Sequence, residues 1–215
     1  MCRNAVASMI LENRVRLDKE FAMSLPEHVS NPIVIGFLME LAVLSSIALN
    51  GLNITSDLNV PMDVGFFKND VPAFNATSDK TVLYVPTVFN FPNIDGVIVR
   101  IPKSGKKKGK PELFMYPLQI TLQPEKHSNS RAKFFGAWKK WTKSLQNFDV
   151  VPEFVWITPK ELSRTKYDES PKWPAHVEQY VRISHVSAEA WNWYEEGKQI
   201  KRTTRVRKLI WLLAF

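Results

Sequence analysis

The chain has 215 residues, a formal net charge of +8 and 45% hydrophobic residues, which is enough apolar material to bury one sizeable core. A single cysteine, Cys2, excludes an internal disulfide framework, and the four histidines lack the spacing of a zinc finger. Charged residues interrupt the first apolar run too early for a secretory signal, so we expect an intracellular protein.

The positive charge is concentrated in one segment. Between Arg100 and Lys143 there are twelve Lys and Arg residues against two acids, so this segment carries +10 and the remainder −2. Such a distribution predicts a surface that meets phosphates or acidic partners. A dense run in this segment comprises Lys106, Lys107, Lys108 and Lys110. By itself that run is equally compatible with a solvated loop, and it also fits a nuclear-localisation signal.

Two helices are predicted in the first quarter of the chain. Apolar spacing predicts one over residues 4–24. Pro32 then begins a second, almost wholly apolar stretch that ends before Gly51, which is the usual punctuation of a helix. Its length approaches that of a membrane span. Glu40 at its centre and the lack of basic flanks favour a buried core helix and no membrane partner.

Most strands are predicted in the middle of the chain. Pro117 has no N–H to donate, so the strand that contains it either bulges there or begins at Leu118. A polar loop is predicted over residues 161–174. Strands are predicted over residues 59–64, 81–84, 96–101, 113–122, 150–157 and 177–185.

Two further helices follow the strands of the middle region. Ser128 or Ser130 is expected to cap the first, whose aromatic and apolar stripe we assign to the core. That stripe consists of Phe134, Trp138, Trp141, Leu145 and Phe148. Ser187 is the expected cap of the second helix. Together these elements predict one α/β domain over 31–196, preceded by a helical segment, 1–30, and followed by a basic, then apolar tail, 197–215.

A polar constellation lies within this strand region. Asp95 stands at the head of an apolar strand, and Gln119 and Thr121 point to one face of the next, while Leu118 and Ile120 point to the other. A polar pair on an otherwise buried strand requires a physical reason. For Asp95 alone, the structural alternative is an ordinary turn residue before Gly96.

These residues resemble a known family. The resemblance rests on Tyr84-Val85-Pro86, Asn90-Phe91-Pro92-x-Ile94-Asp95, Leu118-Gln119-Ile120-Thr121 and His127. This pattern is similar to the effector domain of Crinkler-type and retrotransposon hot spot proteins and extends over about residues 30–195. The resemblance implies a restriction-endonuclease-like fold of the PD-(D/E)XK superfamily. That fold is a mixed central sheet flanked by helices, here with an extra N-terminal helix, and its activity would be that of a nuclease effector or toxin.

The resemblance also implies a Mg²⁺ or Mn²⁺ site. Asp95 matches the first metal-binding carboxylate, and Glu40 matches a glutamate that many members add from a helix. Glu40 has a structural alternative, a buried acid bonded to backbone. Gln119 stands at the position of the second carboxylate and Thr121 at that of the catalytic lysine. An amide oxygen can bind Mg²⁺ but brings no negative charge, so we expect a lower metal affinity.

Three neighbouring residues are candidates for the missing catalytic groups. Because the lysine migrates in this superfamily, Lys126 or Lys133 could bring an ammonium group to the attacked phosphate. His127 is a candidate general base or phosphate contact, with a cap of the following helix as the equal alternative.

Three hypotheses follow. The first is a metal-dependent nuclease that acts on DNA, and the second is a catalytically degenerate relative that still binds nucleic acid. The third is a protein-interaction module with exposed tryptophans. The nucleic-acid contacts of the first two are expected at Lys106, Lys107, Lys108, Lys110, Arg131, Lys139, Lys140 and Lys143. The tryptophans of the third are Trp138, Trp141, Trp191 and Trp193, whose structural alternative is the core.

Overall fold

A computed structural model of the chain describes residues 32–68, 71–74, 80–88, 91–102, 109–160, 165–169 and 172–199. The helix predicted over 4–24, the three lysines 106–108 and the tail beyond 199 lie outside the described residues.

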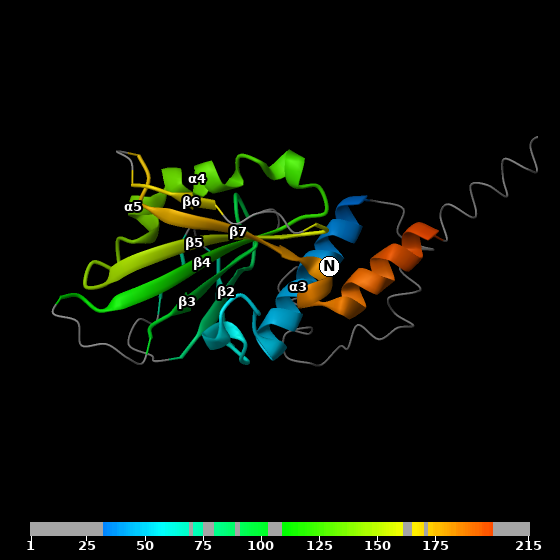
Figure 1. Cartoon of the computed structure of the whole chain (residues 1–215), viewed down its shortest axis with the longest axis horizontal. Helices are drawn as coiled ribbons and strands as arrows, with labels where there is room; N and C mark the ends of the chain where they lie inside the picture. Colours follow the sequence, from blue (N-terminus) through cyan, green and yellow to red (C-terminus); the bar gives the residue numbers. More distant parts are fainter. Residues whose placement is uncertain are drawn as a thin grey trace, which may run out of the picture.

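The described chain is built on a seven-stranded sheet in the order β1-β2-β3-β4-β5-β7-β6 (Figure 1). Strands β2, β3 and β4 form an antiparallel meander, while β5 and β7 continue the sheet parallel to β4. The edge strand β1 is parallel to β2, and the edge strand β6 is antiparallel to β7. The strands are β1 (Asp63–Phe67), β2 (Val82–Pro86), β3 (Gly96–Arg100), β4 (Glu112–Ile120), β5 (Asp149–Thr158), β6 (Thr165–Tyr167) and β7 (His176–Arg182). The mixed α/β fold class is therefore confirmed.

Helix α3 (Pro32–Asn50) is the buried core helix that the sequence predicts. It ends at Gly51, which has φ +83° and donates its backbone N–H to the Ile47 carbonyl at 2.8 Å. A side chain at Gly51 would place its Cβ only 2.3 Å from the Leu58 carbonyl oxygen, so the turn requires glycine. Within the described ranges, no helix is both long and apolar enough to cross a membrane.

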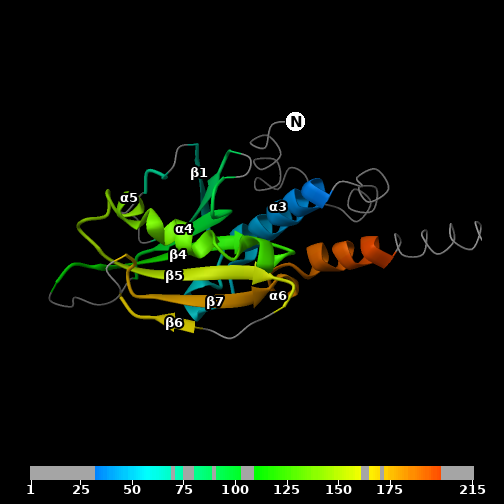
Figure 2. The same ribbon diagram turned by 90° about the horizontal axis from the view of Figure 1, so that it is seen from above.

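The two faces of the sheet carry separate hydrophobic clusters. One lies beneath α3, α6 (Ile183–Val186) and the helical residues 188–199. The other lies beneath α4 (Ser130–Gly136) and α5 (Trp138–Trp141). Figure 1 shows α3 beside the 188–199 helix, with α4 and α5 along another side of the sheet, and Figure 2 gives the view from above.

The helix predicted after Ser128 is broken, and this part of the prediction is wrong. Ala137 leaves the helical conformation, with its N–H bonded to the Phe134 carbonyl, and divides the segment into α4 and α5. The weak helix propensity of Gly136 favours a break at this point. Helix α4 begins at Ser130 without a side-chain cap on its N-cap residue, Asn129. Its aromatic stripe is nevertheless buried or packed against the core, as predicted.

Four strand predictions need correction. Strand β7 ends at Arg182, because the residues up to 185 that were predicted to continue it belong to helix α6. Strand β4 runs through Pro117 without a bulge, because its register with β3 is continuous and its pairing with β5 resumes in the same register at Leu118. Strand β1 lies a few residues after its predicted place, and β6 occupies part of the expected loop over 161–174. The three-residue β6 has too little apolar alternation to be detected from sequence.

The four tryptophans named as a possible interaction surface all pack against the hydrophobic clusters of the sheet. Trp141 is 4% exposed, and Trp138, Trp191 and Trp193 are partly buried against the two clusters. Three of the four side chains keep part of their surface in solvent, and only Trp141 is fully enclosed. The predicted cap of the last helix is present, because Ser187 Oγ accepts the Ala190 N–H at 3.3 Å.

Candidate functional site

The site is built where β3 begins beside the end of β4. Asn93, in the left-handed region with φ +78°, turns the chain before Asp95. Asparagine tolerates this conformation better than most residues. The backbone N–H of Asp95 then bonds to the Leu118 carbonyl at 2.8 Å, which fixes the carboxylate against β4.

Asp95 and Gln119 are in direct contact. Gln119 Nε2 donates to Asp95 Oδ2 at 2.7 Å, and the backbone N–H of Ile120 donates to the same oxygen at 2.6 Å. Hydrogen bonds to a charged acceptor are stronger than neutral ones, so this half-buried carboxylate is firmly oriented. The side chain of Gln119 is 4% exposed, so its amide is held within the protein rather than in solvent. The structure therefore brings together two residues that lie far apart in sequence.

Thr121 follows on the same side of β4, as predicted, but its side chain and its N–H both form hydrogen bonds with backbone groups. Its Oγ1 accepts the Gln123 N–H at 3.0 Å, and its own N–H donates to the Ile157 carbonyl at 3.0 Å. The hydroxyl thus stabilises the turn that ends the strand. It carries no positive charge and does not replace a lysine.

One carboxylate and one neighbouring amide make a sparse set of ligands for a hard, oxygen-preferring cation. Among the described residues, no group of three or more His, Cys, Asp or Glu side chains could hold a metal ion. A cation at Asp95 would therefore depend on this carboxylate, the Gln119 amide oxygen and at most one further acid. Gln119 would have to turn its amide so that the oxygen faces the ion. Glu40 is half-buried on α3, whose cluster includes Leu118 and Ile120, on the sheet face opposite Gln119.

The candidate proton-transfer and lysine residues lie on the surface after β4. Lys126 and His127 belong to the short helix η2 (Pro124–His127), and Lys133 lies on α4; all three side chains are exposed. The pKa of His127 is lowered, first by partial desolvation and second by the charge of Lys126. A lowered pKa favours the neutral imidazole, the form that accepts a proton.

Exposed lysines continue along α5 and beyond. Lys139, Lys140 and Lys143 are all exposed, so α4, α5 and the following turn present positive charge to solvent. Lys110 lies near this surface in the fold, because its Nζ donates to the Gln146 carbonyl at 2.7 Å.

A second polar cluster, which the sequence analysis missed, surrounds Glu178 on the α4 side of the sheet. Glu178 is 6% exposed. Its Oε1 accepts the Trp156 indole N–H at 2.6 Å and the Tyr180 hydroxyl at 3.2 Å. Its Oε2 accepts the Tyr167 hydroxyl at 2.8 Å and forms an ion pair with Arg131 at 3.3 Å. The signal that could have revealed it is the spacing of His176, Glu178 and Tyr180, which places all three on one face of β7.

This cluster changes the interpretation of Arg131, which the sequence analysis assigned to nucleic-acid contact. The guanidinium carbon lies 4.0 Å above the Tyr167 ring, and only 17% of the side chain is exposed. Arg131 therefore joins α4 to the β6–β7 edge. Burial and the neighbouring Glu178 also raise the pKa of Tyr180 to about 12, so this hydroxyl remains protonated and donates to the carboxylate.

Comparison with protein-family models, curated proteins and solved structures gave no significant match.

Proposed function

We propose that this domain is a Mg²⁺-dependent, nuclease-like effector that acts on DNA phosphodiesters. The observation that carries the proposal is the contact between Asp95 and Gln119 across neighbouring antiparallel strands. The resemblance to the PD-(D/E)XK superfamily requires two oxygen-bearing side chains at adjacent strand ends, and these two residues meet that requirement.

Each part of the site has a role in this proposal. Asp95 supplies the negative charge for the cation, and Gln119 supplies a neutral oxygen. A bound Mg²⁺ would provide Lewis-acid stabilisation of the charge that develops on the phosphate. The neutral His127 accepts a proton, while the exposed lysines of α4 and α5 hold the nucleic-acid backbone. The lysine run over 106–110 fits a nuclear-localisation signal, which agrees with a DNA substrate.

A second candidate is a catalytically degenerate domain that binds nucleic acid. A specific observation favours it: Gln119 directs an N–H, not an oxygen, at Asp95, so the amide already stabilises the carboxylate charge. Thr121 also favours the degenerate candidate, because its hydroxyl accepts a backbone hydrogen bond within a turn.

Cleavage of plasmid and single-stranded DNA, with Mg²⁺, Mn²⁺ or EDTA, separates the two candidates. Asp95→Asn keeps the shape of the side chain and removes its charge. We expect it to lower metal-dependent cleavage by about 100-fold or more, because the charged ligand is lost. Asp168→Ala removes an exposed aspartate outside the site and serves as the matched control.

The outcomes are distinct. Metal-dependent cleavage that Asp95→Asn abolishes and Asp168→Ala retains supports the nuclease. If neither the unmodified chain nor the control cuts DNA, but both bind it in a salt-sensitive manner, the degenerate candidate replaces the nuclease.

A further inference from the structure

One row of side chains crosses the α4 side of the sheet and includes the candidate site. Asp95, directly before β3, contacts Gln119 on β4. Gln119 pairs with Trp156 on β5, and Trp156 pairs in turn with Tyr180 on β7. Both aromatic side chains pack in the hydrophobic cluster beneath α4 and α5. The row therefore joins four neighbouring strands, at a spacing of about 4.8 Å from each strand to the next.

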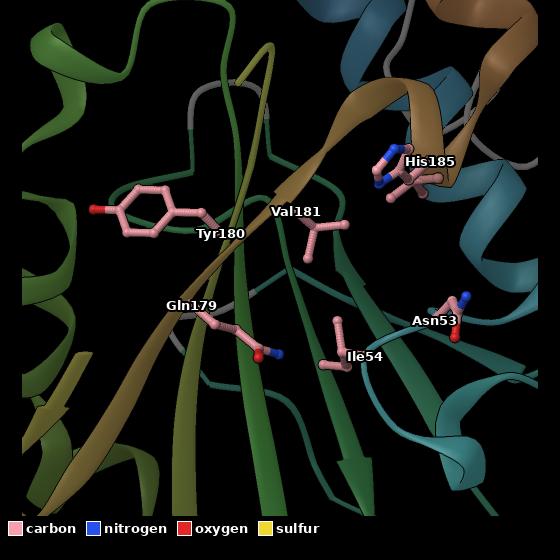
Figure 3. Close-up of a pocket in the computed structure, with 7 residues that line it drawn as sticks. Asn53, Ile54, Gln179, Tyr180, Val181 and His185 are labelled. Atoms are coloured by element: carbon pink, nitrogen blue, oxygen red, sulfur yellow. The ribbon is translucent and has the colours of Figure 1, made fainter. Parts of the chain in front are cut away.

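The indole of Trp156 has a fixed orientation within this row. Its N–H donates to Glu178 Oε1 at 2.6 Å, and its ring stacks on Tyr180 with centroids 5.9 Å apart and planes 7° from parallel. Figure 3 shows the Tyr180 side chain directed away from those of Gln179 and Val181, which line a cavity on the opposite face. The hydrogen bond at its edge and the stacked ring at its face together prevent the buried indole from turning.

Glu178, the acceptor of the indole N–H, is itself held by two further elements. It accepts the Tyr167 hydroxyl from β6 at 2.8 Å and forms an ion pair with Arg131 from α4 at 3.3 Å. Hydrogen bonds to a charged acceptor are stronger than neutral ones, so the position of the carboxylate is well defined. The cluster around Glu178 thus extends from α4 and β6 to the indole beside the candidate site.

The neighbours of Gln119 on the adjacent strands determine where its amide bonds. A glutamine side chain has considerable rotamer freedom, which it loses when it is fixed in the protein. Trp156 lies on its β5 side, and because the indole N–H bonds to Glu178, the indole offers Gln119 only an apolar surface. Asp95 lies on its β3 side and offers a carboxylate. The amide accordingly donates to Asp95, at 2.7 Å.

We propose that Trp156 is a positioning residue for the Asp95–Gln119 pair, and that Glu178 holds its indole in place. The proposal rests on the proposed function, because it names the residues that orient the same candidate site. Trp156 and Glu178 are buried and act on the site through Gln119, without contact to a substrate.

Hydrogen exchange of the Gln119 side-chain amide, measured by NMR on the full chain without metal, tests the proposal. The signal of this amide is identified by its loss in Gln119→Met. Trp156→Phe keeps an aromatic ring but removes the indole N–H and part of the apolar surface. We expect the amide protons of Gln119 to exchange about tenfold faster in this variant. Trp141→Phe makes the same substitution on α5, in the same hydrophobic cluster, and should leave the rate unchanged.

A second variant acts on the hydrogen bond to the indole alone. Glu178→Gln keeps the shape of the side chain and removes its charge, which weakens the bond to Trp156. We expect a smaller acceleration of Gln119 exchange in the same direction, and this variant decides the test if Trp156→Phe does not fold. Equal exchange rates in Trp156→Phe and Trp141→Phe, or in Glu178→Gln and the unmodified chain, would overturn the proposal.

Cleavage of DNA is measured separately, so that the two proposals fail independently. In a chain that cuts DNA, Trp156→Phe should lower kcat about tenfold and leave KM nearly unchanged, because the pair is misoriented while the exposed lysines are intact. Absence of cutting, with Gln119 exchange that depends on Trp156, would remove the nuclease and leave the positioning role. Cutting that depends on Asp95, with exchange that does not depend on Trp156, would do the reverse.

Discussion

At the residue scale, His176 shows how burial decides the behaviour of a polar side chain. Its ring lies between Phe135 and Tyr167, with centroid distances of 4.1 and 4.8 Å. Nδ1 bonds to the Pro174 carbonyl at 2.8 Å, while Nε2 is buried without a partner in the described chain. Protonation would place a second N–H at Nε2, where the described chain offers no acceptor. Burial accordingly lowers the pKa of His176, with Arg131 acting in the same direction.

This lowered pKa predicts a loss of stability in acid. As the pH falls below the ordinary value of 6.5, the unfolded chain takes up a proton before the folded chain does, which favours unfolding. The stability is thus fully present above about pH 6.5 and declines below it. We expect the melting temperature of His176→Phe to fall less between pH 7.5 and 5.5 than that of the unmodified protein. His185→Asn, at an exposed position, is the control, and equal pH slopes for all three proteins would contradict the prediction.

At the scale of elements, the position of each helix depends on a few backbone requirements. Helix α3 ends because Gly51 adopts φ +83°, a conformation that glycine adopts without strain. Helices α4 and α5 are separate because the chain leaves the helical conformation at Ala137. Their aromatic residues still reach the sheet, so the hydrophobic stripe survives the break.

Alanine substitutions at Gly36, within α3, and at Gly51, just after it, are expected to have opposite effects on stability. Gly51→Ala would place a Cβ 2.3 Å from backbone atoms of Leu58 and Val60 and would strain φ, so we expect a loss of about 2 kcal/mol or more. Gly36→Ala, within α3, meets nothing within 4 Å and should stabilise the protein by about 0.5–1 kcal/mol. Urea denaturation measures both. A Gly51→Ala protein as stable as the parent would show that the turn is not constrained in this way.

At the scale of the whole molecule, the positive charge is concentrated in one segment of the chain. The sequence segment from 100 to 143 holds +10, and its described lysines on α4, α5 and the next turn are exposed. Charge of this kind acts on the nucleic-acid backbone irrespective of sequence. Arg131 is set apart from this group because it is ion-paired with Glu178.

Removal of three of these lysines should weaken DNA binding and should also make the binding less sensitive to salt. In the triple variant Lys133→Ala, Lys139→Ala and Lys143→Ala, we expect the slope of log affinity against log salt to decrease by about two. The matched control removes Lys68, Lys80 and Lys198, three lysines outside the segment, and should retain the parental slope. Fluorescence anisotropy at several salt concentrations gives both slopes. Equal slopes for the two triple variants would show that the basic segment does not hold the backbone.

Much of the fold followed from local sequence. The apolar run after Pro32, with Gly51 at its end, was sufficient to predict α3, because helix punctuation depends on backbone chemistry. Alternation along β4 was sufficient to place Gln119 and Thr121 on one face and Leu118 and Ile120 on the other.

Only the tertiary structure decided which side chains meet. The partners of Asp95 and the cluster around Glu178 both depend on strand register. Register is a long-range property, set by the packing of distant segments on the two faces of the sheet. The sequence by itself therefore determined most of the elements and the direction of the faces of α3 and β4. Tertiary packing determined the contacts, because a hydrogen bond between residues 95 and 119 exists only once β3 and β4 have paired.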